Sequence, residues 1–162
     1  EITRMPNSHK VFDSSKIPGE IIDLMIVNTE TLNANPNFGK ALTGAWYEIM
    51  ATMSADDDAG KAARTFMGQA SGTDLAGYEA QLASTRMFYQ PAEAVEFVNS
   101  AALKDTMQKV AEFSFDHGLL GEGAPDAGFI GIETPSGVYG NKGNMKLRFI
   151  PDYMAMAAEG KL

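Results

Sequence analysis

Apolar residues recur at helical spacing through the central part of the chain. The longest stripe follows Asn35-Pro36 with the i, i+4, i+7, i+8 spacing of one apolar helix face, which predicts an amphipathic helix over about 36–53. Pro36 suits the first helical position, because the N–H group it lacks would have no partner there. We interpret Trp46 and most of the methionines as core packing rather than as ligand contacts. The stripe consists of Phe38, Leu42, Ala45, Trp46, Ile49, Met50 and Met53.

Further helices are predicted by capping residues followed by apolar stripes. Asp56-Asp57-Asp58 precede a stripe that ends at Ser71-Gly72. We interpret the three carboxylates as a helix start rather than a metal site, because acids are stabilised at a helix N-terminus and the spacing of an EF-hand loop is missing. The other predicted helices begin at Thr73-Asp74, run over about 91–98, and run from a capping Ser100 to His117-Gly118.

Strand-like patterns occur near both ends of the sequence. Residues 10–13 and 22–28 are predicted strands, and the run Leu24-Met25-Ile26-Val27 is typical of a strand buried on both faces. Thr29 is predicted to cap a short helix that ends at Ala34. Beyond Gly118, frequent Gly, Pro, Asn and Asp predict turns. The remaining elements are predicted strands at 129–132, 138–139 and 144–150 and a helix from Pro151 through Ala158.

Composition limits the functions open to this chain. Its 162 residues, 44% hydrophobic and 21% charged, suit one ordinary globular domain. The net charge of -8 repels phosphate backbones, which disfavours nucleic-acid binding but not binding of a small polar or cationic molecule. No run of about 18 apolar residues predicts a transmembrane helix. The first residues lack the apolar region of a signal peptide and the chain starts with Glu1, so we expect a mature form or a portion of a longer protein.

The sequence lacks the patterns of common catalytic sites. It contains no Cys, which excludes thiolate catalysis and Cys-based zinc sites. The two histidines, His9 and His117, are far apart in sequence, and no metalloprotease, P-loop or serine-hydrolase motif occurs. Gly121-Glu122-Gly123 is not a dinucleotide-binding turn, since Asp126 stands where the third glycine is needed. We therefore expect no enzyme activity, no metal and no cofactor.

One continuous stretch resembles a known family. It runs from Lys10 to Tyr47 and reads KVFDSSKIPGEIIDLMIVNTETLNANPNFGKALTGAWY. A strand carrying LMIVN, a short helix, Asn-Pro and a long amphipathic helix follow in an order that resembles the second half of periplasmic solute-binding proteins of ABC transporters. The group it resembles most is the type II nitrate, sulfonate and taurine group, which includes members for urea-like solutes. Residues 85–121, an aromatic connector and two helices ending in Gly-Leu-Leu-Gly, are similar to the closing helices of that family.

This resemblance implies an α/β, helix-rich fold with a few strands, forming the C-terminal portion of a two-lobed protein that closes on its solute. Residues 1–20 are then the end of lobe two, 21–28 a crossover strand, 29–121 helices that return onto lobe one, and 122–162 a turn-rich tail with short strands and a final helix. The resemblance also implies a periplasmic location, an N-terminal half that completes the cleft, and a membrane permease as partner. The implied solute is small and polar: a sulfonate, nitrate, urea or an amine.

Two short polar segments are the candidate ligand-binding residues. Asp13, Ser14 and Ser15 follow a predicted strand, where their carboxylate, hydroxyl and N–H groups are placed to bind a polar solute. Asn28 and Thr29 follow the predicted strand at 22–28 and form the second candidate. For both segments the alternative is a local role, as an Asx or Ser turn in the first and as a helix cap in the second.

Two other hypotheses stay open beside solute binding. One is an enzyme on the same two-lobed scaffold, as in pyrimidine-synthesis relatives of the family, although this version calls for a cluster of His or Cys that the sequence lacks. The other is an autonomous helical interaction domain, which predicts a self-contained core within these 162 residues.

Overall fold

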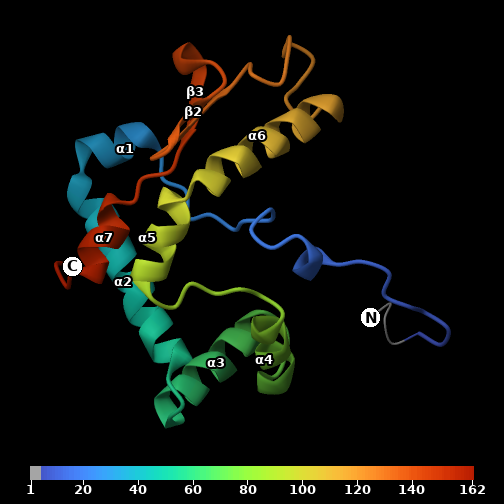
Figure 1. Cartoon of the computed structure of the whole chain (residues 1–162). Helices are drawn as coiled ribbons and strands as arrows, with labels where there is room; N and C mark the ends of the chain where they lie inside the picture. The colour runs from blue at the N-terminus through green and yellow to red at the C-terminus, as the bar shows by residue number, and fades with distance from the viewer. Residues whose placement is uncertain (1–4) are drawn as a thin grey trace.

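The computed structural model describes residues 5–162 and shows a helix-rich α/β protein with a small three-stranded mixed sheet. Helix α6 and the sheet form one end of the molecule, α3 and α4 form the other, and α2, α5 and α7 lie between them (Figure 1). The helices are α1 (Thr29–Ala34), α2 (Pro36–Ser54), α3 (Asp58–Ala70), α4 (Leu75–Ala83), α5 (Pro91–Asn99), α6 (Ala101–Asp116) and α7 (Asp152–Ala158). The strands are β1 (Gly131–Thr134), β2 (Gly137–Tyr139) and β3 (Met145–Arg148), and short 3-10 turns occur at Ser14–Lys16 and Lys142–Asn144.

Helices α3 and α4 begin where the sequence predicts, at side chains that cap them. Asp57 Oδ1 accepts a hydrogen bond from the Gly60 N–H at 2.7 Å, and Asp74 Oδ1 accepts one from the Gly77 N–H at 2.8 Å. Each bond satisfies one of the N–H groups that a first helical turn leaves unpaired. The interpretation of the Asp56-Asp57-Asp58 run as a helix start is therefore confirmed.

The sheet joins an antiparallel hairpin to a parallel strand in the order β2-β1-β3. Ile132 of β1 lies opposite Tyr139 of β2 and Leu147 of β3. Gly131 is required where β1 begins, because a Cβ atom there would lie 2.4 Å from the Asn141 carbonyl oxygen. The three strands overlap the predicted strands at 129–132, 138–139 and 144–150, but β1 begins and ends two residues later than predicted.

The core lies between α5, α6 and the sheet. Leu103 of α6 is 1% exposed, and Met107, one turn later, is also buried. Ile132 packs with them from the sheet. Helix α7 then meets α2 closely, since a Cβ atom on Gly39 would lie 2.7 Å from the ring of Tyr153. Partly buried side chains at the margin of this core are Ile22, Phe97, Ile130, Tyr139, Leu147, Phe149 and Met154.

The apolar stripe of α2 is only partly covered. Met50 and Met53 are buried, as the spacing predicts, but Trp46 is 42% exposed and Ile49 is 47% exposed. The prediction that Trp46 packs in the core is therefore wrong. Helical spacing shows which side of a helix is apolar, but it does not establish that another element of the chain covers that side.

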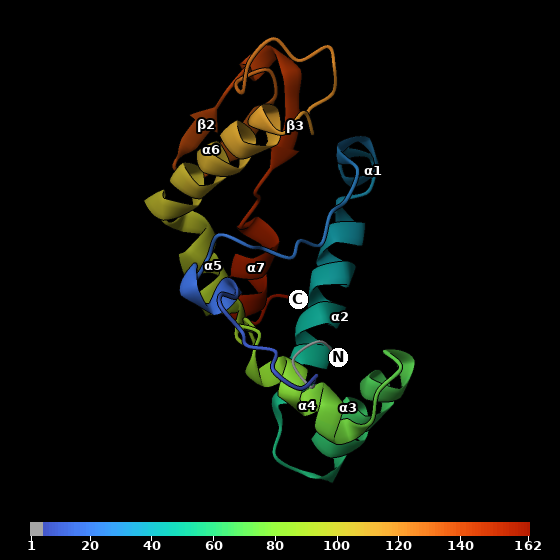
Figure 2. The same cartoon turned by 90° about the vertical axis from the view of Figure 1, so that its right-hand side faces the viewer.

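The two strands predicted near the N-terminus are not formed. Residues 10–13 are irregular and lead into the turn Ser14–Lys16, and residues 22–28 pair with no strand of the described chain. Figure 2 shows the second segment passing from the side of α5 to α1 as a single span of chain. A strand needs a neighbour that exchanges backbone hydrogen bonds with it, and residues 5–162 place none beside this span.

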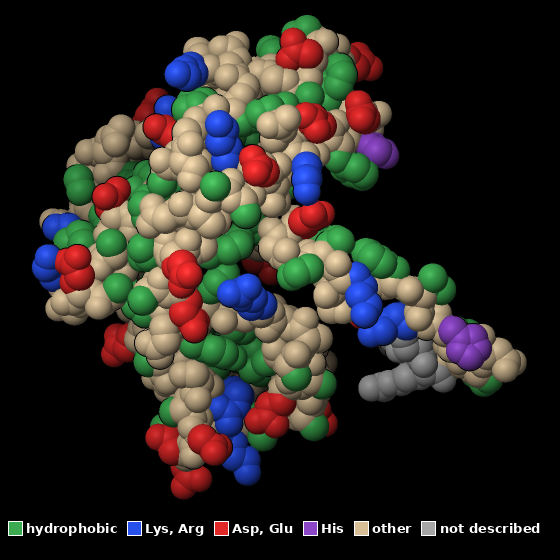
Figure 3. Space-filling model, in the orientation of Figure 1, with side chains coloured by type: hydrophobic (Ala, Val, Ile, Leu, Met, Phe, Trp, Pro, Cys, Tyr) green, Lys and Arg blue, Asp and Glu red, His purple; other side chains and the backbone are tan. Residues whose placement is uncertain are grey.

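The chain exposes more surface than a compact protein of its size. Its accessible surface is 11059 Å², whereas a compact monomer of this length exposes about 7,900 Å². The difference is about 3,200 Å² of polar and apolar surface together. Figure 3 shows hydrophobic side chains reaching the surface among the charged groups. Large apolar side chains that are more than two-thirds exposed are Val11, Ile21, Ile26, Phe66 and Leu119.

Replacement of Leu103 by alanine is expected to lower the free energy of unfolding by about 2–5 kcal/mol, because it removes buried methyl groups and leaves a cavity. Leu119 is the matched control: it is 69% exposed, and Leu119→Ala is expected to change stability by less than about 0.5 kcal/mol. Equilibrium urea denaturation of the two variants measures both effects. Equal losses would show that Leu103 is not the centre of the core.

Candidate functional site

The first predicted binding segment forms a closed local turn. Asp13 Oδ1 accepts hydrogen bonds from the Ser15 N–H at 3.0 Å and from the Ser15 hydroxyl, and Asp13 Oδ2 forms an ion pair with Lys10. These contacts make Asp13 the cap of the 3-10 turn Ser14–Lys16. The hydrogen bond from Lys10, followed by those from Ser15, lowers the pKa of Asp13 from 3.8 to about 2. The Asp13 carboxylate is therefore charged at neutral pH and already bound on both oxygens.

The second predicted segment caps helix α1. Asn28 Oδ1 accepts hydrogen bonds from the N–H groups of Glu30 at 2.9 Å and Thr31 at 3.1 Å. Asn28, and not Thr29, is therefore the cap, and Thr29 is the first helical residue. This corrects the predicted start of the helix by one residue. Both side chains are exposed, and within residues 5–162 neither the Asn28 amide nitrogen nor the Thr29 hydroxyl makes a hydrogen bond.

The described fold does not bring the two segments together. In Figure 1 the turn at 14–16 lies on the N-terminal arm, which extends away from the body of the molecule, and α1 lies on the opposite side. The span at 21–28 leads from the arm to α1 (Figure 2). Two hollows on the surface are lined by other residues. One lies between α3 and α4, beside Gln69, Thr73 and Asp74, and the other borders Met53, Arg64 and Tyr89. The predicted ligand contacts therefore stay predictions, and each has a local structural role or an exposed position. They are Asp13, Ser14, Ser15, Asn28 and Thr29.

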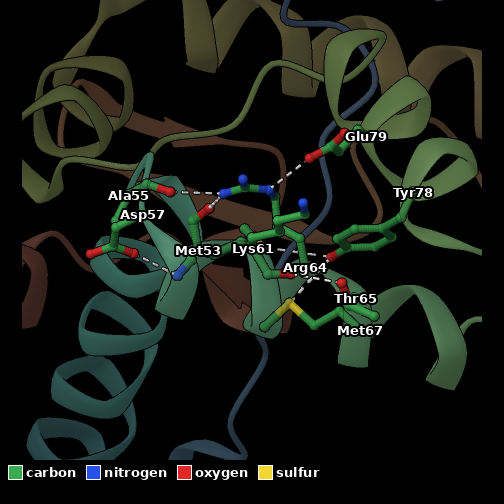
Figure 4. Close-up of polar contacts among 10 residues, drawn as sticks. Met53, Ala55, Asp57, Lys61, Arg64, Thr65, Met67, Tyr78 and Glu79 are labelled. Carbon is green, nitrogen blue, oxygen red and sulfur yellow. Dashed lines mark hydrogen bonds and ion pairs between the residues drawn. The ribbon is translucent and has the colours of Figure 1, made fainter.

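A polar cluster that the sequence analysis missed joins α2, α3 and α4 (Figure 4). Arg64 Nη1 donates hydrogen bonds to the carbonyl oxygens of Met53 at 2.8 Å and Ala55 at 2.9 Å, where α2 ends. Arg64 Nε forms an ion pair with Glu79 of α4 at 3.1 Å. One guanidinium therefore satisfies the last carbonyls of one helix and ties two other helices to it. The one signal in the sequence that could have revealed this cluster is a single Arg among the mostly small and apolar residues of α3.

The Tyr78 hydroxyl lies next to this cluster and contacts two sulfur atoms. Its oxygen is 3.4 Å from Met67 Sδ and 3.6 Å from Met53 Sδ. Thioethers are weak acceptors, so these contacts contribute mainly packing. Arg64 Nε and Nη1 and the Tyr78 hydroxyl all contact groups of the protein, so we assign the cluster a structural role as the corner between α2, α3 and α4.

The described residues show no metal centre and no membrane-spanning helix. No group of three or more His, Asp or Glu side chains within residues 5–162 is arranged to hold a metal ion. No helix in that range is long and apolar enough to cross a membrane.

Comparison of this chain with protein-family models finds no match, and comparisons with curated proteins and with solved structures find none either. The resemblance of residues 10–121 to solute-binding proteins therefore stays a prediction from the sequence.

The turn at Asp13 yields a testable pH effect. Because its pKa is lowered, the ion pair and hydrogen bonds of the turn are fully present above pH 3.8 and are lost as pH falls through about 2. An NMR titration of the Asp13 carboxyl is expected to give a midpoint near that lower value. Lys10→Met is expected to raise the midpoint toward 3.8, whereas Lys16→Met, outside these contacts, is expected to leave it unchanged. Identical midpoints in both variants would contradict the assigned cause.

Arg64 yields a stability prediction. Arg64→Met is expected to lower the free energy of unfolding by about 1.5–3 kcal/mol, because two partly buried carbonyl oxygens lose a charged donor. Glu79→Gln removes only a half-exposed ion-pair partner and is expected to cost less than about 1 kcal/mol. Urea denaturation separates the two effects. If Glu79→Gln is as damaging as Arg64→Met, the ion pair and not the helix-end contact holds this corner.

Proposed function

We propose that this chain is the C-terminal portion of the solute-binding component of an ABC importer. It captures a small polar solute in a cleft between two lobes in the periplasm and delivers it to a membrane permease. The proposal rests on the resemblance of residues 10–121, and one structural observation supports it: much of the apolar surface between residues 21 and 49 is uncovered.

The uncovered surface comes from one continuous part of the chain. We call Ile21, Leu24, Met25, Ile26, Phe38, Trp46 and Ile49 the uncovered apolar set. Ile21, Leu24, Met25 and Ile26 of the span are 41–73% exposed, and the side chains on α2 are 42–47% exposed. Large apolar side chains that a protein leaves exposed in such number commonly mark a site that a partner covers. The members on α2 are Phe38, Trp46 and Ile49.

A complementary N-terminal portion is the partner that this proposal requires. In a two-lobed binding protein the chain crosses between the lobes, so a span such as 21–28 is covered by protein on several sides. The excess accessible surface of about 3,200 Å² is enough for an obligate interface, which buries about 1,000–2,500 Å² on each partner. The hypothesis of an autonomous helical domain is less well supported, because such a domain covers its own apolar surface.

In this proposal the polar contacts to the solute come from Asn28 and Thr29, because the described fold keeps the turn at 14–16 apart from them. Asn28 uses its side-chain oxygen to cap α1, which fixes the amide group and leaves two N–H donors directed away from the helix N–H groups. The Thr29 hydroxyl lies next to it in the chain and is also exposed. Fixed amide and hydroxyl donors suit a sulfonate, nitrate or the oxygen of urea.

Solute binding is tested with the complete product of the gene that encodes these 162 residues. Taurine, nitrate, urea and ethanolamine serve as probes in thermal unfolding, and one of them is expected to raise the melting temperature, because a ligand at about 100 times its Kd stabilises the native state by about 2.7 kcal/mol.

Asn28→Asp is the informative variant, since aspartate caps a helix as well as asparagine but lacks the amide donors. It is expected to abolish the shift. Asp74→Asn makes the reverse exchange at the cap of α4 and is expected to keep the shift. If none of the four solutes changes the melting temperature, solute binding of the proposed class is contradicted.

A further inference from the structure

The oxidisable sulfur of this chain lies entirely in its methionines. The sequence has ten Met and no Cys, so a peroxide that reaches these residues meets thioethers and no thiol. A thioether that takes up one oxygen atom becomes a sulfoxide, which is polar where the thioether is apolar. The effect of this modification on the structure therefore depends on whether a hydrogen-bond donor faces the sulfur.

Tyr78 places such a donor at the sulfur of Met67. The Tyr78 hydroxyl oxygen lies 3.4 Å from Met67 Sδ and 3.6 Å from Met53 Sδ, and it makes no other hydrogen bond within residues 5–162. Figure 4 shows the Tyr78 hydroxyl, on α4, directed at the sulfur of Met67 on α3. A hydroxyl has one proton to donate and a thioether is a weak acceptor, so this donor has no strong acceptor in the unmodified protein.

Met67 is the more accessible of the two sulfur-containing side chains. It is partly exposed, whereas Met53 is 3% exposed and Met50, one turn earlier on α2, is 4% exposed. Exposure governs how readily a methionine is oxidised. We therefore expect a peroxide to react with Met67 before it reaches the two buried methionines of α2.

From these observations we infer that Met67 is a site of oxidation to the sulfoxide, and that the Tyr78 hydroxyl binds the oxygen atom that is added. The oxidant is a hydroperoxide. Its O–O bond breaks as the Met67 sulfur forms a bond to the outer oxygen, and the inner oxygen takes the proton of the transferred one and leaves as water or an alcohol. The sulfur loses the two electrons that the peroxide gains.

The added oxygen turns a weak contact into a conventional hydrogen bond. A hydroxyl binds an oxygen acceptor at about 2.7 Å, and rotation about the flexible bonds of the Met67 side chain brings the sulfoxide oxygen within this reach of Tyr78. The new bond joins α3 to α4, as the ion pair of Arg64 with Glu79 already does. Oxidation of Met67 therefore preserves the corner between α2, α3 and α4. The inference concerns this corner and does not depend on solute binding.

Peptide mass spectrometry locates the modification after the complete gene product is treated with hydrogen peroxide. Trypsin releases residues 65–86, in which Met67 is the only methionine, and residues 41–61, which carry Met50 and Met53. The peptide with Met67 is expected to gain one oxygen atom at least about tenfold faster than the other, because its methionine is more exposed. Equal rates, or faster oxidation of residues 41–61, overturn the inference.

Thermal unfolding of samples oxidised at Met67 tests the role of Tyr78. Oxidation is expected to lower the melting temperature of the unsubstituted protein by less than about 1 °C. In Tyr78→Phe, which keeps the ring and removes the hydroxyl, oxidation is expected to lower it by at least about 3 °C, because the sulfoxide then has no donor. Tyr89→Phe is the matched control, since the Tyr89 hydroxyl makes no hydrogen bond within residues 5–162, and it is expected to behave as the unsubstituted protein.

A double variant assigns the thermal effect to one sulfur atom. Met67→Leu added to Tyr78→Phe is expected to abolish the loss, because leucine cannot take up oxygen. A loss that persists in the double variant overturns the inference. A loss of equal size with and without the Tyr78 hydroxyl, or no loss in either protein, also overturns it, because the hydroxyl then does not bind the sulfoxide.

Discussion

Burial of apolar surface is the constraint on which the rest of this structure depends. It is met around Leu103 and Met107, where α6 packs against α5 and β1. It is not met by the uncovered apolar set between residues 21 and 49. Each 100 Å² of apolar surface left in water forgoes about 2.5 kcal/mol, so a protein surface that covers this set is strongly favoured. The small core and the large accessible surface follow from the same imbalance.

Local hydrogen bonding governs the polar residues. Asp13, Asn28, Asp57 and Asp74 each accept N–H groups within three residues of their own position, which secures a turn or the start of a helix. Arg64 is different, since its contacts reach 9 to 15 residues away and join three helices. A ligand cleft requires side chains from distant segments to converge. The described residues achieve such convergence at the Arg64 corner, where Nε and Nη1 of Arg64 are already bound to protein groups.

The sequence predicted most helices because their signals are local. The caps at Asp57, Asp74 and Ser100 each lie within a few residues of the N–H groups they bind. It failed at residues 10–13 and 22–28, because strand formation depends on a partner that a local pattern does not contain. It failed at Trp46 for a related reason. Helical spacing identifies the apolar face of a helix but not whether another element of the chain covers that face. Arg64 was missed because its carbonyl partners lie in another helix end. The predicted ligand contacts could be recognised from the local sequence as turn and cap residues. Their role in binding a solute depends on a cleft between distant segments, which a local pattern does not contain.

Fluorescence of Trp46 tests the central claim most directly, because it is the one tryptophan of these residues and belongs to the uncovered apolar set. Acrylamide quenching is measured in the 162-residue chain and in the complete gene product, with any tryptophan outside this range replaced by phenylalanine. A complementary portion that covers residues 21–49 predicts weaker quenching in the complete product. Equal quenching in both proteins would show that Trp46 stays open to water, and would contradict the claim.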